Sequence, residues 1–98
     1  MAAWNSNGLT VRTATGTVDT VLATDDVIVY SNTAAKAVSL PAEAARQPGK
    51  VYFFSNQATG AVTITPASGT IDGAATLVVA ATTGRAQIVS DGTNWFTV

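Results

Sequence analysis

Apolar and polar residues alternate over short stretches along almost the whole chain, and a period of two is the pattern of β-strands. Leu9 and Val11 flank a threonine, Val38 and Leu40 flank a serine, and the same spacing recurs further on. Threonine is abundant, and its β-branched side chain fits a pleated, half-exposed strand but loses freedom in a helix. The sequence therefore predicts an all-β chain.

Turn-forming residues interrupt these stretches at short intervals, as in Pro48-Gly49 and Asp91-Gly92. Gly, Asn and Asp tolerate the positive φ that tight turns need. The strands that we expect between the turns cover residues 9–13, 17–22, 27–31, 37–40, 50–55, 61–65, 70–71, 76–80, 86–90 and 94–98.

Many short strands at this spacing are typical of sandwiches and barrels. We expect a compact antiparallel β-sandwich or barrel, jelly-roll-like, with at most one short helical turn over residues 41–46, between Pro41 and Arg46. Proline is favourable at a first helical position, and Pro48-Gly49 would end the turn. No fixed internal period is convincing, so a repeat protein is not expected.

The 98 residues contain no linker or block of charge, which predicts one domain over residues 9–98 after an N-terminal arm of residues 1–8. The start lacks the features of a signal peptide, and the longest apolar run, residues 77–81, is far shorter than the ~20 residues that span a bilayer. We expect synthesis in the cytoplasm and no membrane partner.

The charge and composition of the chain limit the functions that it can have. Charged residues make up 11% of the chain and the formal net charge is −1, so no basic field exists to bind the phosphates of a nucleic acid. Histidine and cysteine are absent, which removes the usual proton shuttle, disulfides and the main zinc ligands. We predict a protein that is not an enzyme and uses no cofactor or metal.

Three alternatives to that prediction stay open. Ser39 or Ser55 could act with Lys50 as base, although no nucleophile elbow is present. A hydrolase needs only two carboxylates, and the candidates are Asp19, Asp25, Asp26, Glu43, Asp72 and Asp91. Most of them stand in expected turns, where Asp bonds to its own backbone. A Ca²⁺ site from Asp91, Thr93 and Asn94, or from Asp25 and Asp26, lacks the spaced calcium loop.

Three stretches are apolar on both sides of the expected strand: residues 27–30, 51–54 and 77–79. One reading is that these are central strands with some exposed apolar residues. The other is that both faces are covered, one of them by a partner, because large apolar patches are rare on monomers. We favour self-association, through Tyr30, Tyr52, Phe54 and Val78.

Aromatic residues near the two ends of the chain call for separate explanations. Trp95-Phe96 is explained by core packing. Trp4 lies in a polar segment that cannot form a core, so we expect it, with Leu9, to dock onto a neighbouring protein. The alternative is a disordered chain end.

Residues 17–98 also contain an ordered series of short motifs: VIVY at 27–30, VSLP at 38–41, PGKVYFFSN at 48–56, VTIT at 62–65, GTIDG at 69–73 and SDGTNW at 90–95. In this order they resemble a module of bacteriophage tail-fibre, head-fibre and capsid-decoration proteins. The resemblance implies a β-sandwich or barrel that usually forms trimers, is exposed on the virion and has no catalytic activity. It fixes no receptor-contacting residue.

In the larger fibre proteins this module is one part of a long chain, whereas here it fills nearly the whole sequence. We therefore expect a virion structural protein, a homotrimeric capsid decoration (cement or head-fibre) protein on the capsid exterior. Its partners would be itself and the major capsid protein or other virion proteins, with no nucleic acid. The alternative is a tail-tip or tail-fibre module for host attachment.

Overall fold

The computed structural model describes residues 9–32, 34–42 and 46–98, and this part of the chain contains nine strands. Each expected strand but one is confirmed to within two residues at either end. The expected strand at 70–71 is reduced to isolated bridges of Ile71 with Ala74 and Trp95. Most of the expected helical turn over 41–46 lies outside the described residues, because residues 43–45 are not described. The expected arm at 1–8, with Trp4, and Glu43 also lie outside them.

The strands are β1 (Val11–Ala14), β2 (Val18–Thr20), β3 (Val27–Tyr30), β4 (Lys36–Leu40), β5 (Val51–Asn56), β6 (Val62–Pro66), β7 (Leu77–Val79), β8 (Gly84–Ser90) and β9 (Trp95–Thr97).

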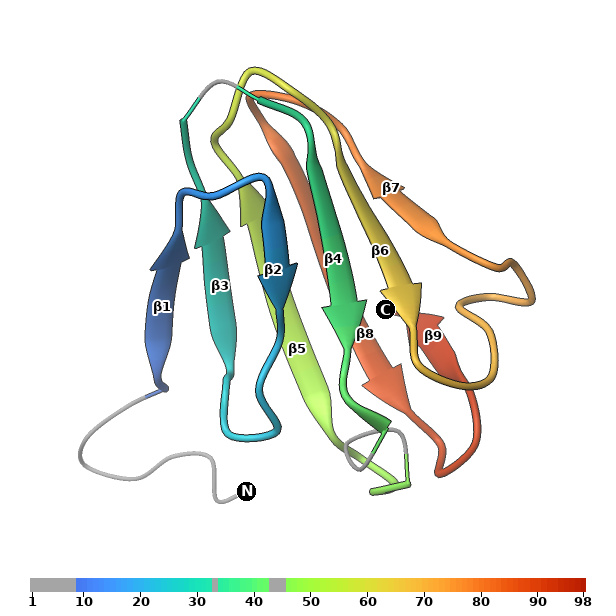
Figure 1. Ribbon diagram of the computed structural model, residues 1–98. Helices are drawn as coiled ribbons and strands as arrows, with labels where there is room; N and C mark the ends of the chain where they lie inside the picture. Colours follow the sequence, from blue (N-terminus) through green and yellow to red (C-terminus); the bar gives the residue numbers. More distant parts are fainter. Residues whose placement is uncertain (1–8, 33, 43–45) are drawn as a thin grey trace.

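The strands form two sheets that lie one on the other (Figure 1). The five-stranded sheet has the order β1-β3-β5-β8-β9, and the four-stranded sheet has the order β2-β4-β6-β7. Both sheets are open, with β1 and β9 as the edges of the first and β2 and β7 as the edges of the second. The expected barrel is therefore not formed.

The first six strands wind as a parallel coil. The chain passes from one sheet to the other at every strand, so β1, β3 and β5 pair in parallel, and β2, β4 and β6 do the same. A parallel pair needs a long crossover, and here a strand of the opposite sheet provides it. We call β1–β2, β3–β4 and β5–β6 the first, second and third turns of the coil.

The expected antiparallel pairing is wrong for the coil and correct only for β5–β8, β6–β7 and β8–β9, so both sheets are mixed. The register also explains why no repeat is visible in the sequence. Val11, Val27 and Phe53 stand side by side but are 16 and 26 residues apart in the chain.

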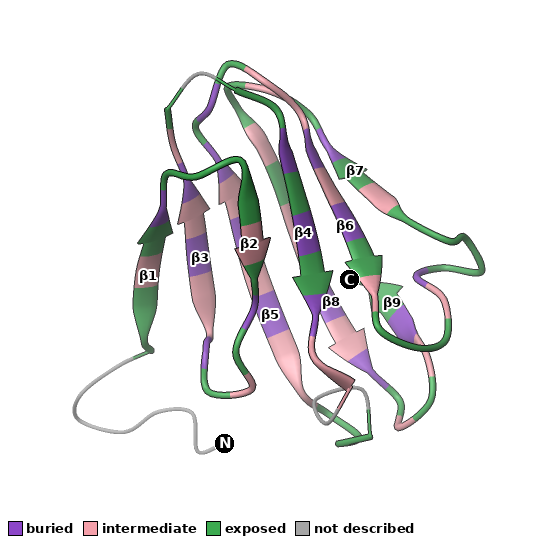
Figure 2. Ribbon diagram, viewed as in Figure 1, coloured by how far each residue is buried: buried purple, intermediate pink, exposed green. Residues whose placement is uncertain are grey.

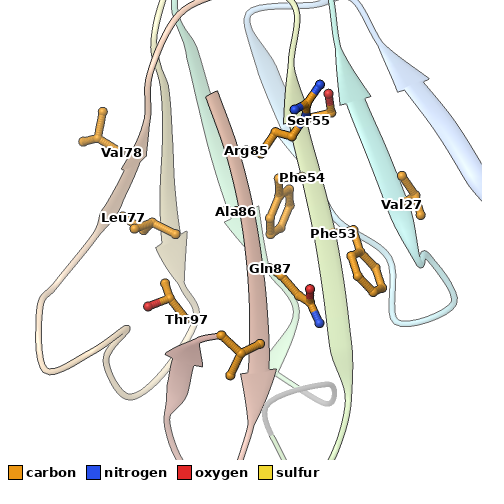
Figure 3. Close-up of a pocket in the computed structure, with 11 residues that line it drawn as sticks. Val27, Phe53, Phe54, Ser55, Leu77, Val78, Arg85, Ala86, Gln87 and Thr97 are labelled. Carbon is orange, nitrogen blue, oxygen red and sulfur yellow. The ribbon is translucent and has the colours of Figure 1, made fainter. Parts of the chain in front are cut away.

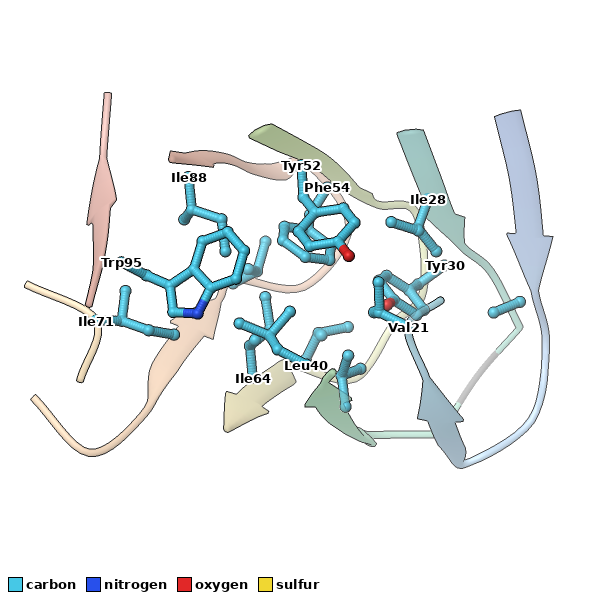
Figure 4. Packing of buried hydrophobic residues seen from close by; sticks show 14 residues of the cluster. Val21, Ile28, Tyr30, Leu40, Tyr52, Phe54, Ile64, Ile71, Ile88 and Trp95 are labelled. Atoms are coloured by element: carbon cyan, nitrogen blue, oxygen red, sulfur yellow. The ribbon is translucent and has the colours of Figure 1, made fainter. Parts of the chain in front are cut away.

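The hydrophobic core fills the space between the sheets and contains residues from every strand except β2. The Tyr52 ring packs against those of Phe54 and Trp95, with centroids 6.1 and 5.5 Å away, within the core that Figure 4 shows. Val38, Leu40 and Ile64 of the four-stranded sheet close the core from the other side. These contacts hold the two sheets in one fixed relation, which leaves the outer faces as the surfaces available to partners.

A buried asparagine ties the end of the coil to the strands that follow. The side-chain nitrogen of Asn56 donates to the carbonyls of Gly60, Val79 and Ala80 at 3.0 to 3.1 Å, and its oxygen accepts the Ala58 N–H at 2.9 Å. All hydrogen-bonding groups of the amide are thus engaged inside the protein, where an unsatisfied one would be costly.

Candidate functional site

Three of the aromatic residues predicted to mediate self-association lie in the core. Tyr30 and Tyr52 have no exposed surface, and Phe54 is 2% exposed. Their assignment to contacts between chains is therefore wrong. Successive side chains of a strand point to opposite faces, and the outward side of these strands carries Val27, Val29, Val51 and Phe53 instead. Figure 2 shows this alternation along β3 and β5.

These outward residues belong to a larger apolar surface that crosses the whole five-stranded sheet. Neighbouring outward residues stand in register, as in the row Val11–Val27–Phe53 and the row Val51–Val89–Phe96. Polar residues of the same surface are Thr13, Ser55, Gln87 and Arg85, and only Arg85 is charged. We call this surface the apolar face: its members are Val11, Val27, Val29, Val51, Phe53, Val89, Phe96 and Val98.

A hollow of about 500 Å³ lies beside this surface, and its lining combines outward residues of the five-stranded sheet with Phe54, Ala86 and Leu77, which belong to the core or pack against it. Figure 3 shows Val27, Phe53 and Gln87, on three adjacent strands, among the residues that line it. Leu77 and Val78 of β7 line it as well. Val78, which we predicted to take part in self-association, is 59% exposed and so remains available to a partner.

The outer face of the four-stranded sheet has a different composition. Its central positions are Ala37, Ser39, Thr63 and Thr65, all small or hydroxylated. Large apolar residues occur only on the edge strands, as Val18 of β2 and Val78 of β7. Small polar side chains are compatible with water, so the two broad faces of the molecule differ in what they can contact.

Leu9, the described member of the predicted docking pair, precedes β1 and is 37% exposed. It lies close in sequence to Val11, which is 61% exposed. The exposed position leaves Leu9 available for docking, which stays a prediction.

A polar cluster occupies the interior of the first turn. The Arg12 guanidinium donates to both carboxylate oxygens of Asp19 at 2.8 and 2.9 Å and to Oδ2 of Asp25 at 2.9 and 3.1 Å. The Tyr30 hydroxyl donates to Asp19 at 3.0 Å. Beside them, buried Lys36 donates to the carbonyls of Thr15 and Gly16, which fixes the turn between β1 and β2.

The cluster is electrostatically matched. Burial alone would raise the pKa of Asp19, but the hydrogen bonds from Arg12 and Tyr30 outweigh it, and the pKa lies below its usual range. Burial and the neighbouring Asp19 carboxylate raise the pKa of Tyr30. Asp19 is thus a paired structural ion, a role that the sequence did not predict when it named Asp19 as a candidate carboxylate for hydrolysis.

The other aspartates act in loops. Asp91 Oδ1 accepts the N–H groups of Thr93 and Asn94 at 2.9 and 2.8 Å, and Asp72 Oδ1 accepts the Thr97 N–H at 2.9 Å. The hydrogen bonds from Asn94 and, second, from Thr93 lower the pKa of Asp91. The pKa of Asp72 is also lowered, first by the hydrogen bond from the Thr97 side chain and second by that from the Thr97 backbone. The expected turn role is confirmed for Asp91.

The remaining candidates for chemistry are spread over the molecule. The Lys50 ammonium donates to the Asp25 carbonyl at 2.9 Å and lies 4.8 Å from the centre of the Tyr52 ring. Ser55 stands on the outer face of the five-stranded sheet, whereas Ser39 stands on that of the four-stranded sheet. Among the described residues, no three acidic side chains gather closely enough to hold a metal ion.

Comparison with known proteins gives no family for this chain. No family model matches it, and no curated protein is significantly similar in sequence. Within residues 9–32, 34–42 and 46–98, no helix is long and apolar enough to cross a membrane.

Proposed function

We propose that the chain is a virion structural protein, a homotrimeric decoration protein that binds the outer surface of a bacteriophage capsid and stabilises it. We also propose that its two mixed sheets are a variant of the β-sandwich found in such particle modules. The observation that carries the proposal is the apolar face, which offers a broad, nearly uncharged surface suited to protein contact.

The physical mechanism is binding linkage. A ligand that binds only the assembled shell stabilises it by RT ln(1 + [L]/Kd), about 2.7 kcal/mol per site at a free concentration of 100 times Kd. A trimer attaches at several points, and the high effective concentration of the second and third attachments strengthens the whole. Stabilisation of the shell would thus depend on the area of contact with it. The motif series in residues 17–98 supports the assignment to a phage particle.

A tail-tip or tail-fibre module for host attachment is the second candidate. The observation that favours it is the hollow of about 500 Å³ beside β7, because concave sites of this size suit small ligands. Its lining mixes Phe53 and Leu77 with Arg85 and Gln87, a combination that can contact both the apolar and polar parts of a receptor.

Copy number separates the two candidates. Quantitative mass spectrometry of purified particles, and of heads separated from tails, should find the chain in hundreds of copies and in the head fraction. A count of a few copies in the tail fraction would replace decoration by host attachment. Absence from both fractions would refute a virion role altogether.

A further inference from the structure

We propose that the apolar face is the contact surface between the copies of the homotrimer, so that the apolar face of one chain is covered by the apolar faces of the other two. This assignment rests on the proposed self-associating structural role and adds the surface and the residues that perform it. The contact centres on Phe53, with Val27 and Val51 beside it.

The central strands β3 and β5 of the five-stranded sheet are apolar on both sides. Sheets of parallel strands are normally covered on both faces, and their strands are then apolar on both sides. β3 and β5 are of this kind, with valine or phenylalanine outward and isoleucine, tyrosine or phenylalanine inward. In β4 and β6, by contrast, the outward residues are alanine, serine and threonine. Only the five-stranded sheet is therefore built to be covered a second time.

The outer face of the five-stranded sheet is broad. The molecule measures 34 × 33 × 20 Å along its principal axes. Stacked sheets lie ~10 Å apart, so the short axis is the stacking direction. The outline of each broad face is then on the order of 1,000 Å², comparable with the roughly 800 Å² that each partner contributes to a standard specific interface. Contacts that covered the whole outer face of the five-stranded sheet would therefore reach a standard size.

The apolar face carries little charge. A surface that meets its own copy brings like charges together, so a self-contact needs a surface with few of them. The apolar face carries only Arg85, near the beginning of β8. At the opposite edges, β1 and β2 instead point Arg12 and Asp19 inward, and inward charges on edge strands oppose edge-to-edge pairing. These features favour face-to-face contact over extension of the sheets.

The test places a charge at the centre of each broad face. Phe53→Asp changes the apolar face, and Thr63→Asp makes the matched change on the four-stranded sheet. Sedimentation equilibrium and light scattering should show the wild-type chain and Thr63→Asp as oligomers and Phe53→Asp as a single chain, with circular dichroism confirming that both variants are folded.

A second measurement holds even where Phe53→Asp fails to fold. The chain has no cysteine, so Val27→Cys and Ala37→Cys each introduce a unique thiol, one on each outer face. Alkylation of Val27→Cys should slow as protein concentration rises, because the oligomer covers it, whereas alkylation of Ala37→Cys should be independent of concentration.

The two proposals fail in different ways. A wild-type chain that stays monomeric at high concentration, or an oligomer in which Ala37→Cys is protected and Val27→Cys is not, would overturn the assignment of the apolar face. Neither result removes the decoration role if heads still carry hundreds of copies. Oligomers formed through the apolar face by a chain that is missing from particles would leave this inference standing and refute the proposed function.

Discussion

The first turn of the coil and the two later turns use the same inward positions for opposite purposes. In register with Arg12 of β1 stand Ile28 of β3 and Phe54 of β5, and both are buried apolar residues. The outward positions of the first turn include Val11 and Val18, which are among the most exposed large hydrophobic residues of the described chain, and the hydroxylated Thr13 and Thr20.

The same holds in the four-stranded sheet, where Asp19 of β2 aligns with Val38 and Ile64. The later turns are covered on both sides by neighbouring strands, so apolar side chains gain from burial there. Among the described residues, the first turn has a neighbouring strand on one side only. The described coil therefore ends where its interior becomes charged, because a further turn stacked on β1 and β2 would have to bury Arg12 and Asp19 completely, at a large cost in desolvation.

Removing the cation should give the largest effect. Arg12→Ala leaves Asp19 and Asp25 without their guanidinium, and Asp25 has only 5% of its side chain exposed. Breaking a buried pair in this way costs 3–5 kcal/mol in general. Because 29% of the Arg12 side chain is exposed, we expect a loss of about 3 kcal/mol in the free energy of unfolding, measured by urea denaturation.

Arg46→Ala is the control for that experiment, because Arg46 is exposed and surface substitutions usually change stability by less than about 0.5 kcal/mol. If Arg12→Ala and Arg46→Ala unfold at the same urea concentration, the cluster adds nothing to stability and the contrast between the turns is only one of composition.

Removing one hydroxyl should give a smaller loss. Tyr30→Phe keeps the ring, which stacks on Phe54 at 6.2 Å, but deletes the hydrogen bond to Asp19. Hydrogen bonds to charged groups contribute about 1.5–3 kcal/mol. Because Arg12 still binds Asp19, we expect about 1.5 kcal/mol. Since Tyr30 is the link between the first turn and the second, a double-mutant cycle with Asp19→Asn should show coupling between the two changes; independent effects would mean that the two turns are stabilised separately.

The sequence predicted the strands well because alternation and turn residues are local signals. It did not predict their pairing, because the parallel partners Val11, Val27 and Phe53 are separated by 16 and 26 residues and nothing local says which strand comes next to which. The inward side of β5 was also undetermined, since its first four residues are apolar on both sides, and a shift of one residue exchanges the two faces.

For the candidate site, the sequence indicated the right strands and the wrong side chains. The two-sided apolar stretches do carry the apolar face, but through Val27, Val29, Val51 and Phe53 instead of the tyrosines and Phe54. The polar cluster was missed because alternation alone does not say which side of a strand faces inward, and in β1 and β2 the apolar residues Val11 and Val18 face outward. Opposite charges at Arg12 and Asp19, on either side of the Thr15-Gly16 turn, were the signal that could have located it.

Acid should weaken the first turn. The pKa of Asp19 is lower in the folded protein than its ordinary value of 3.8. A lowered folded pKa gives stability that is complete above the unfolded pKa and is lost as pH falls through the folded pKa. Unfolding measured from pH 5 to pH 2 should therefore show stability falling below about pH 4. Asp19→Asn cannot titrate at this position and should lose less over the same interval; an equal loss would assign the acid sensitivity to exposed Asp72 and Asp91.

We expect the smallest change in stability from a triple substitution that removes the charges of the first turn. Arg12→Ile, Asp19→Val and Asp25→Asn together give the first turn the residues of the second, Ile28 and Val38, and replace the remaining acid by an amide that can still accept the Leu22 N–H. Exchanging a buried ionic cluster for apolar residues is often stabilising, which offsets the cost of leaving the buried Tyr30 hydroxyl without its Asp19 acceptor. We therefore expect a free energy of unfolding within about 1 kcal/mol of wild type. Sedimentation velocity should then show new, larger species, because inward charges no longer guard the edges of β1 and β2. If the triple variant is as stable as wild type and no larger, the charges protect nothing and the coil ends there for another reason. If the triple variant forms larger species, and still forms them when Thr63→Asp is added, the charged interior of the first turn serves to prevent further chains from pairing with β1 and β2. Stability alone would then not explain the charges.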